Sequence, residues 1–172
     1  MRTVTFADPK VVDFLNKRFV VTWNNHSHER PAAGQQAPYS SAEIAAYPEG
    51  GGGNNLVTVI AAPDGTVLNS FPGYWTVETF LQELDFSLGL TRENAAGRRA
   101  ERMHSLQDQA AKLLKSNPEE AGKRIKDSPV LRRKAALELL ALCYQPALLL
   151  ENQPIESLLA TFAERSRGRV FV

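Results

Sequence analysis

Sulfur is scarce in this chain, whose 172 residues include one cysteine, Cys143, and two methionines. A single cysteine excludes an intramolecular disulfide and any Cys-x-x-Cys redox pair. No apolar run is long enough to cross a bilayer, and no basic start followed by an apolar stretch marks a signal peptide. The sequence therefore predicts a soluble cytoplasmic protein. A secreted or periplasmic location is expected only if the true N-terminus lies upstream of Met1.

Net charge is also nearly absent, because 20 basic residues face 19 acidic ones and leave a formal charge of +1. Such a balance creates no general field that would attract nucleic acid or a membrane surface, and neither partner is expected. Basic residues do gather in one predicted helix, but Glu93, Glu101 and Asp108 lie among them, which favours a solvated face. These basic residues are Arg98, Arg99, Arg102, Lys112 and Lys115.

The first 55 residues combine one clear helix, one strand signal and a long irregular stretch. Asp8 followed by Pro9 is typical of a helix start, with a side-chain acceptor at the N-cap and proline in the first turn. The β-branched and aromatic run Phe19–Trp23 then indicates a strand. Residues Asn24–Asn55 are polar and rich in proline and glycine, which predicts a long and mobile loop.

A hairpin and a helix follow this loop. Leu56–Ala62 is apolar at both odd and even positions, as expected of a strand that is buried on both faces. Pro63-Asp64-Gly65 is typical of a turn, and apolar and polar residues alternate along Thr66–Phe71, which predicts a returning strand. Thr76 is expected to cap a helix that ends near Gly89. The strand and the helix are predicted to share a core made of Val57, Val59, Ile60, Phe80, Leu81 and Leu84.

From residue 91 onward the pattern is helical. We expect a charged helix over Thr91–Ser116, a short helix from Pro118 to about Lys126, and a strongly apolar helix starting at Ser128-Pro129. The apolar stripe of that third helix is Leu131, Ala135, Leu139 and Leu142. A last helix is expected from Pro154, and residues 169–172 are a short strand candidate.

Two ordered sets of motifs resemble a thioredoxin-like domain. The first reads F-x-D-P-x-V and N-x-x-F-V between Phe6 and Val20, and the second reads P-D-G-x-V-L, G-Y and F-L-x-x-L between Pro63 and Leu84. The resemblance implies an α/β thioredoxin-like domain over residues 1–90, incomplete at its N-terminus and holding the loop 24–55. An all-α helical extension over residues 91–172 would follow, with the strand candidate 169–172 at its end.

The features that make such domains catalytic are missing from this chain. Members of the family carry a strand and a Cys-x-x-Cys pair ahead of the first motif, and a cis-proline where this chain has Asn55. No catalytic residue therefore carries over, no cofactor is expected, and the resemblance implies a redox-inactive module that binds a protein partner. One alternative is the C-terminal part of a thiol–disulfide oxidoreductase whose Cys-x-x-Cys lies upstream of Met1. Another is a structural or assembly protein that acts through its helical half.

The missing strand also leaves a slot in the sheet that the resemblance implies. That slot separates Phe19–Trp23 from Leu56–Ala62, and buried backbone groups without partners are costly. An upstream segment is one candidate to fill it. Residues 169–172 are another, either within the same molecule or donated to a second copy, which would make a domain-swapped homodimer. A frayed C-terminal tail is the plain alternative.

Few side chains are candidates for a site. Trp23, Tyr74 and Trp75 are aromatic residues near one end of the implied sheet, where they would either bind a peptide or cap the core. His26 and His28 are the only pair that resembles metal ligands, and a solvated loop is the competing interpretation because a zinc site needs further ligands. Cys143 lies near an apolar helical stripe, which favours a small buried hydrophobe over a nucleophile.

Overall fold

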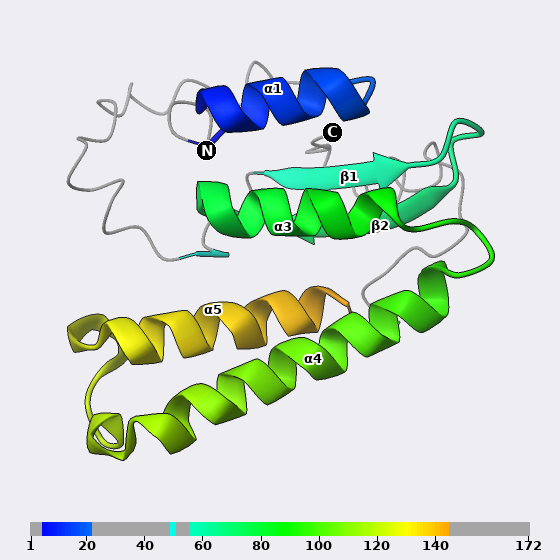
Figure 1. The fold of residues 1–172 in the computed structure, drawn as a ribbon. Coiled ribbons are helices and arrows are strands. Elements are labelled where there is room, and N and C mark those ends of the chain that lie inside the picture. The colour runs from blue at the N-terminus through cyan, green and yellow to red at the C-terminus, as the bar shows by residue number, and fades with distance from the viewer. Residues whose placement is uncertain (1–4, 22–48, 51–55, 145–172) are drawn as a thin grey trace, which may run out of the picture.

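The computed structural model describes residues 5–21, 49–50 and 56–144. Within them the chain has mixed α/β content, with four α-helices and a two-stranded antiparallel sheet. The helices and strands are α1 (Pro9–Arg18), β1 (Val57–Ala61), β2 (Val67–Pro72), α3 (Val77–Leu88), α4 (Ala95–Ser116) and α5 (Pro129–Cys143). Figure 1 shows α1, α3 and the sheet stacked above a hairpin made of α4 and α5. None of the helices in the described ranges is long and apolar enough to cross a bilayer.

Helix α1 begins where its cap predicts. The Asp8 carboxylate accepts a hydrogen bond of 2.8 Å from the Lys10 backbone N–H, and Pro9 occupies the first turn. On this helix Val11 is fully buried, and the partly buried Phe14 packs against the hydrophobic core. The strand expected from Phe19 is wrong for residues 19–21, which form no strand. β-branched residues favour a strand only where a neighbouring strand pairs with them, and no described strand lies beside residues 19–21.

The predicted hairpin is confirmed. Strand β1 pairs antiparallel with β2, placing Val57 opposite Pro72 and Ile60 opposite Asn69. In the turn, the Asp64 carboxylate accepts a 2.9 Å hydrogen bond from the Thr66 N–H. The neighbouring Gly65 has φ +81°, a left-handed conformation that glycine adopts without a Cβ penalty.

The predicted core around α3 is largely confirmed. Thr76 caps the helix by accepting a hydrogen bond from the Thr79 N–H, and the helix ends at Gly89. Of the six predicted core residues, Val57, Ile60, Phe80 and Leu84 are buried, whereas Val59 and Leu81 are half-buried. The Phe80 ring lies edge-on to two other rings, 5.3 Å from Phe6 and 5.7 Å from Phe71 between centroids. This apolar cluster joins α1, the hairpin and α3.

The connections of the helical half differ from expectation. Helix α4 begins at Ala95 instead of Thr91, because residues 91–94 form a turn closed by the Thr91 N–H and the Asn94 side-chain oxygen, 2.8 Å apart. The helix expected from Pro118 to Lys126 is replaced by two 3₁₀-turns, η2 (Pro118–Glu120) and η3 (Ile125–Asp127). Gly122 lies between them at φ +90°, which interrupts a right-handed helix.

Helix α5 begins as predicted but buries a different face. The Ser128 hydroxyl accepts a 3.0 Å hydrogen bond from the Leu131 N–H. The buried side chains are Ala136, Leu137, Leu140 and Ala141. Two members of the predicted stripe, Leu139 and Leu142, are 39% and 44% exposed. The helix carries apolar residues all round, so periodicity alone does not select the face that packs against α4.

Several expectations fall outside the described residues. They are the loop character of 24–48 and 51–55, the helix from Pro154, the strand candidate 169–172, and therefore the strand exchange that would make a homodimer. The strand that was expected to fill the slot between Phe19–Trp23 and Leu56–Ala62 stays a prediction.

Candidate binding surface between helices α3 and α4

A buried carboxylate organises the junction between α3 and the helical hairpin. Glu83 of α3 is 0% exposed and accepts hydrogen bonds from the Arg102 guanidinium of α4 and from the Tyr144 hydroxyl at the end of α5. A buried charge without partners is costly, and both carboxylate oxygens are used here. Glu83 therefore fixes the position of α4 and Tyr144 relative to α3.

The hydrogen-bond network continues into the β-hairpin β1–β2 through uncharged side chains. The Asn69 amide of β2 donates to the Ser87 hydroxyl at 2.8 Å and to the Tyr144 oxygen at 3.3 Å. Ser87 in turn donates to the Glu83 backbone carbonyl at 2.6 Å. Hydrogen-bonded chains of this kind hold one arrangement when every member is satisfied.

Protonation states follow from this burial. Burial, and then the charge of Glu83, raises the pKa of Tyr144, so its hydroxyl keeps the proton that it donates. Burial works to lower the pKa of Arg102, but the hydrogen bond and charge of Glu83 outweigh it and the net shift is upward. Arg102 is thus a permanent cation beside the surface described next.

An aromatic ring with two cations lies above this network. The Arg98 and Arg102 guanidinium carbons lie 5.8 and 5.7 Å from the Phe86 ring centroid, within cation–π range. The two arginines are four residues apart on α4 and so lie on the same face. On another side, Tyr144 meets the Phe86 ring edge-on at 5.6 Å.

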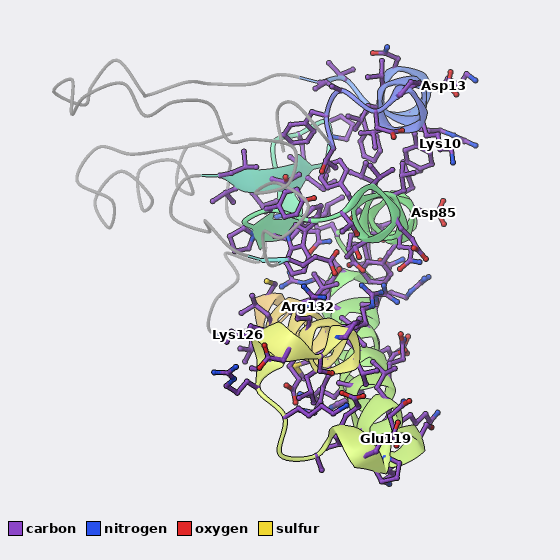
Figure 2. All side chains as sticks on the ribbon, turned by 90° about the vertical axis from the view of Figure 1, so that its left-hand side faces the viewer. Lys10, Asp13, Asp85, Glu119, Lys126 and Arg132 are labelled. Carbon is purple, nitrogen blue, oxygen red and sulfur yellow. The ribbon has the colours of Figure 1, made fainter. Side chains whose placement is uncertain are left out.

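These groups line an open depression of about 530 Å³, which we call the Phe86 surface. Its lining residues are Gln82, Asp85, Phe86, Gly89, Arg98, Arg102 and Gln109. Among the described residues Arg98 forms no ion pair, and the buried Arg102 Nε has no hydrogen-bond partner. Asp85 lies on the outer side of α3, away from the sheet (Figure 2). The surface therefore combines the apolar ring of Phe86 with two guanidinium groups and one carboxylate.

A second polar cluster holds residues 49–50 against the N-terminus of α3. The Glu49 carboxylate accepts hydrogen bonds from the Thr76 N–H and hydroxyl, at 3.1 and 2.6 Å, and pairs with Arg133 of α5 at 3.1 Å. Arg133 also donates to the Thr79 hydroxyl at 3.0 Å. Burial opposes ionisation of Glu49, but the hydrogen bonds from Thr76 and Thr79 and then the charge of Arg133 leave its pKa lowered.

The predicted aromatic site is only partly placed. Trp75 is 1% exposed, its indole N–H donates to the Pro72 carbonyl at 3.0 Å, and its own carbonyl accepts from Thr5 at 2.7 Å. Trp75 therefore packs in the hydrophobic core, in agreement with the alternative interpretation that these aromatic residues cap the core. Tyr74 is half-buried, and burial followed by the charge of Glu49 raises its pKa. Trp23 lies outside the described residues.

The remaining candidates have no reactive environment where the structure describes them. Cys143 is half-buried, and its Sγ lies 3.3 Å from the Leu139 carbonyl. Burial, and then the charge of Glu83, raises the pKa of this thiol to about 12, so almost none of it is thiolate at neutral pH. His26 and His28 lie outside the described residues, within which no three His, Cys, Asp or Glu side chains gather around a metal site.

The sequence interpretation missed the polar junction. Arg99, assigned to a solvated face, is 1% exposed, and Arg102 is half-buried, whereas Arg98, Lys112 and Lys115 are exposed as expected. A signal was present in α3, where Glu83 and Ser87 flank the apolar stripe four residues apart. Helical spacing places them together, but it does not name the partners on other elements.

Comparison with known proteins adds no family to this picture. The chain matches no protein-family model, no curated protein and no solved structure. Its function is therefore argued from the surface itself.

Proposed function

We propose that this protein is a non-catalytic protein-interaction module, built on a thioredoxin-like first half and a helical extension. The observation that carries the proposal is the Phe86 surface, where a half-buried aromatic ring lies under two guanidinium groups in an open depression. Aromatic residues and arginine are the side chains that contribute most to protein–protein binding energy. The helix, hairpin and helix of α1, β1–β2 and α3 are compatible with the thioredoxin-like part.

The state of the only thiol supports the non-catalytic part of the proposal. Thiol–disulfide exchange requires a thiolate as the attacking group, and efficient enzymes lower the pKa of that thiol. Cys143 has the opposite environment, with a pKa raised to about 12. A dithiol mechanism also needs two cysteines, whereas this chain contains only Cys143.

Rigidity supports the binding part. The hydrogen bonds of Glu83 hold Arg102 in place, and Arg102 together with Tyr144 holds the Phe86 ring from two sides. A preorganised surface loses less conformational entropy when a partner binds. The buried network thus prepares a surface without taking part in chemistry.

Position-specific photocrosslinking tests the proposal. A photoreactive phenylalanine analogue replaces Gln82, an exposed residue at the rim of the depression, so that both arginines are kept. A matched variant carries the analogue at Lys112, an exposed position on α4. We expect a protein adduct from position 82 that is absent from position 112. The adduct should also disappear in a Phe86→Ala background and should be reproduced with the purified partner.

Two results would overturn the proposal. One is equal crosslinking from both positions, which indicates random collision. The other is dithiol-dependent reduction of insulin that is lost in Cys143→Ser, because a non-catalytic module has no such activity.

A further inference from the structure

We propose that the Phe86 surface binds an acidic peptide segment of a protein partner. A carboxylate of that segment would contact Arg98 and Arg102, and a neighbouring apolar side chain would cover the Phe86 ring. The inference rests on the proposed function and adds the chemistry of the partner.

The charges around the surface favour an anionic partner. Arg102 already shares its charge with Glu83, which is fully buried and cannot reach a ligand. Arg98 is exposed and, within the described ranges, pairs with no carboxylate. Among the lining residues, Arg98 and Arg102 carry positive charge and Asp85 carries negative charge. Glu83 compensates Arg102 from the buried side, which leaves Arg98 as the cation available to a ligand.

The shape and chemistry of the lining favour a peptide carboxylate. Guanidinium groups match the planar fork of a carboxylate, which they bind through paired N–H donors. The Gln82 and Gln109 side chains at the rim supply amide donors and acceptors that suit a peptide backbone. The ring of Phe86 supplies apolar area beside them.

Asp85 weakens the attraction of the depression for any anion, because it is an exposed member of the lining and carries negative charge. Coulomb attraction to the arginines and repulsion from Asp85 grow with the charge of the ligand in the same proportion, so Asp85 does not by itself distinguish a phosphate from a carboxylate. We assign the surface to Asp or Glu side chains of the partner, and the phosphoserine peptide described next tests that choice.

An NMR titration of the ¹⁵N-labelled full chain tests this assignment. The probe is the peptide acetyl-Gly-Glu-Leu-Glu-Phe-Glu-Gly-amide, and two further peptides replace the Glu residues by Gln or the central Glu by phosphoserine. We expect the acidic probe to shift amide signals of Phe86, Gly89, Arg98 and Arg102. The Gln peptide should bind about tenfold more weakly or not measurably, because charge-assisted hydrogen bonds are lost.

Matched variants assign the effect to single charges. Arg98→Gln should weaken the acidic probe about tenfold, whereas Lys112→Gln, which removes the same charge from an exposed site on α4, should change it less than about twofold. Asp85→Asn should strengthen binding severalfold by removing the repulsion. Because all three side chains are exposed, the variants are expected to keep the wild-type amide spectrum elsewhere.

Several outcomes would overturn the inference. They are equal binding of the acidic and Gln peptides, preference for the phosphoserine peptide, signal shifts away from the Phe86 surface, or equal effects of Arg98→Gln and Lys112→Gln. If crosslinking from position 82 still captures a specific protein in that case, the interaction module stands and only its acidic partner is wrong. If both experiments fail, the proposed function fails as well.

Discussion

Two glutamate–arginine pairs hold α3, one on its face and one at its N-terminal end, and they differ in their access to water. Glu83 is 0% exposed and bridges α4 and Tyr144, whereas the Glu49 side chain is 12% exposed and bridges the start of α3 and α5. In the first pair, Glu83 has no access to water that could replace a lost partner, although Arg102 is 21% exposed, whereas the second pair lies at an edge that water can reach from both sides. Loss of the glutamate charge is therefore expected to destabilise the fold more at Glu83 than at Glu49.

The largest effect is expected from breaking the buried pair. Glu83→Gln removes the charge that faces Arg102, leaving a half-buried guanidinium without its counter-ion. We expect the free energy of unfolding to fall by about 3–5 kcal/mol. Urea denaturation measures the change, with Glu138→Gln as the matched control because its pair with Lys134 is exposed on α5. Similar losses in the two variants would contradict the central role of Glu83.

The apolar core that both pairs border comes next. Leu84 is fully buried between the hairpin and the helices. Leu84→Ala should lower the free energy of unfolding by about 2–5 kcal/mol, because deletion of a buried side chain leaves a cavity. Chemical denaturation provides the value. A loss within about 0.5 kcal/mol, as is typical of surface positions, would refute the core assignment.

The edge pair should respond less and should depend on pH. Glu49→Gln should lower the free energy of unfolding by about 1–2 kcal/mol at neutral pH, because neutral hydrogen bonds replace charge-assisted ones. The pKa of Glu49 is lowered in the folded protein, so its carboxylate stabilises the fold fully above the unfolded value of 4.5. That stabilisation is lost as pH falls through the folded pKa.

Thermal melts of wild type and Glu49→Gln from pH 7 to pH 3 measure this difference. The two curves should begin to converge once the pH falls below 4.5, because the unfolded carboxylate then binds a proton more readily than the folded one. A gap that stays constant across the range would mean that the charge of Glu49 does not matter.

The smallest effect concerns Cys143, which lies beside the buried pair without joining it. Cys143→Ala should change stability by about 1 kcal/mol or less, because the side chain is small and half-buried. A thiol with a pKa of about 12 should react slowly with a disulfide reagent near neutral pH and faster as pH rises. Rapid labelling of the folded chain at pH 7 would contradict this environment.

Local signals were sufficient to predict where structure begins. Asp8, Thr76 and Ser128 start three helices as expected, because each cap is a hydrogen bond to a backbone N–H two or three residues ahead. The turn at Asp64 and Gly65 is equally local. Such contacts depend on neighbouring residues and can be read without the rest of the fold.

The pairing of distant residues was decided by the tertiary structure. The sequence alone determined where α1, α3 and α5 begin, the β-hairpin and the presence of a single cysteine, because caps, turn residues and counting depend on a few neighbouring residues. Only the packing of α3 against α4 and α5 selected the buried face of α5, buried Arg99 and paired Glu83 with Arg102. Charged side chains are solvated by default, and burial becomes favourable only when a partner from another element compensates the lost water.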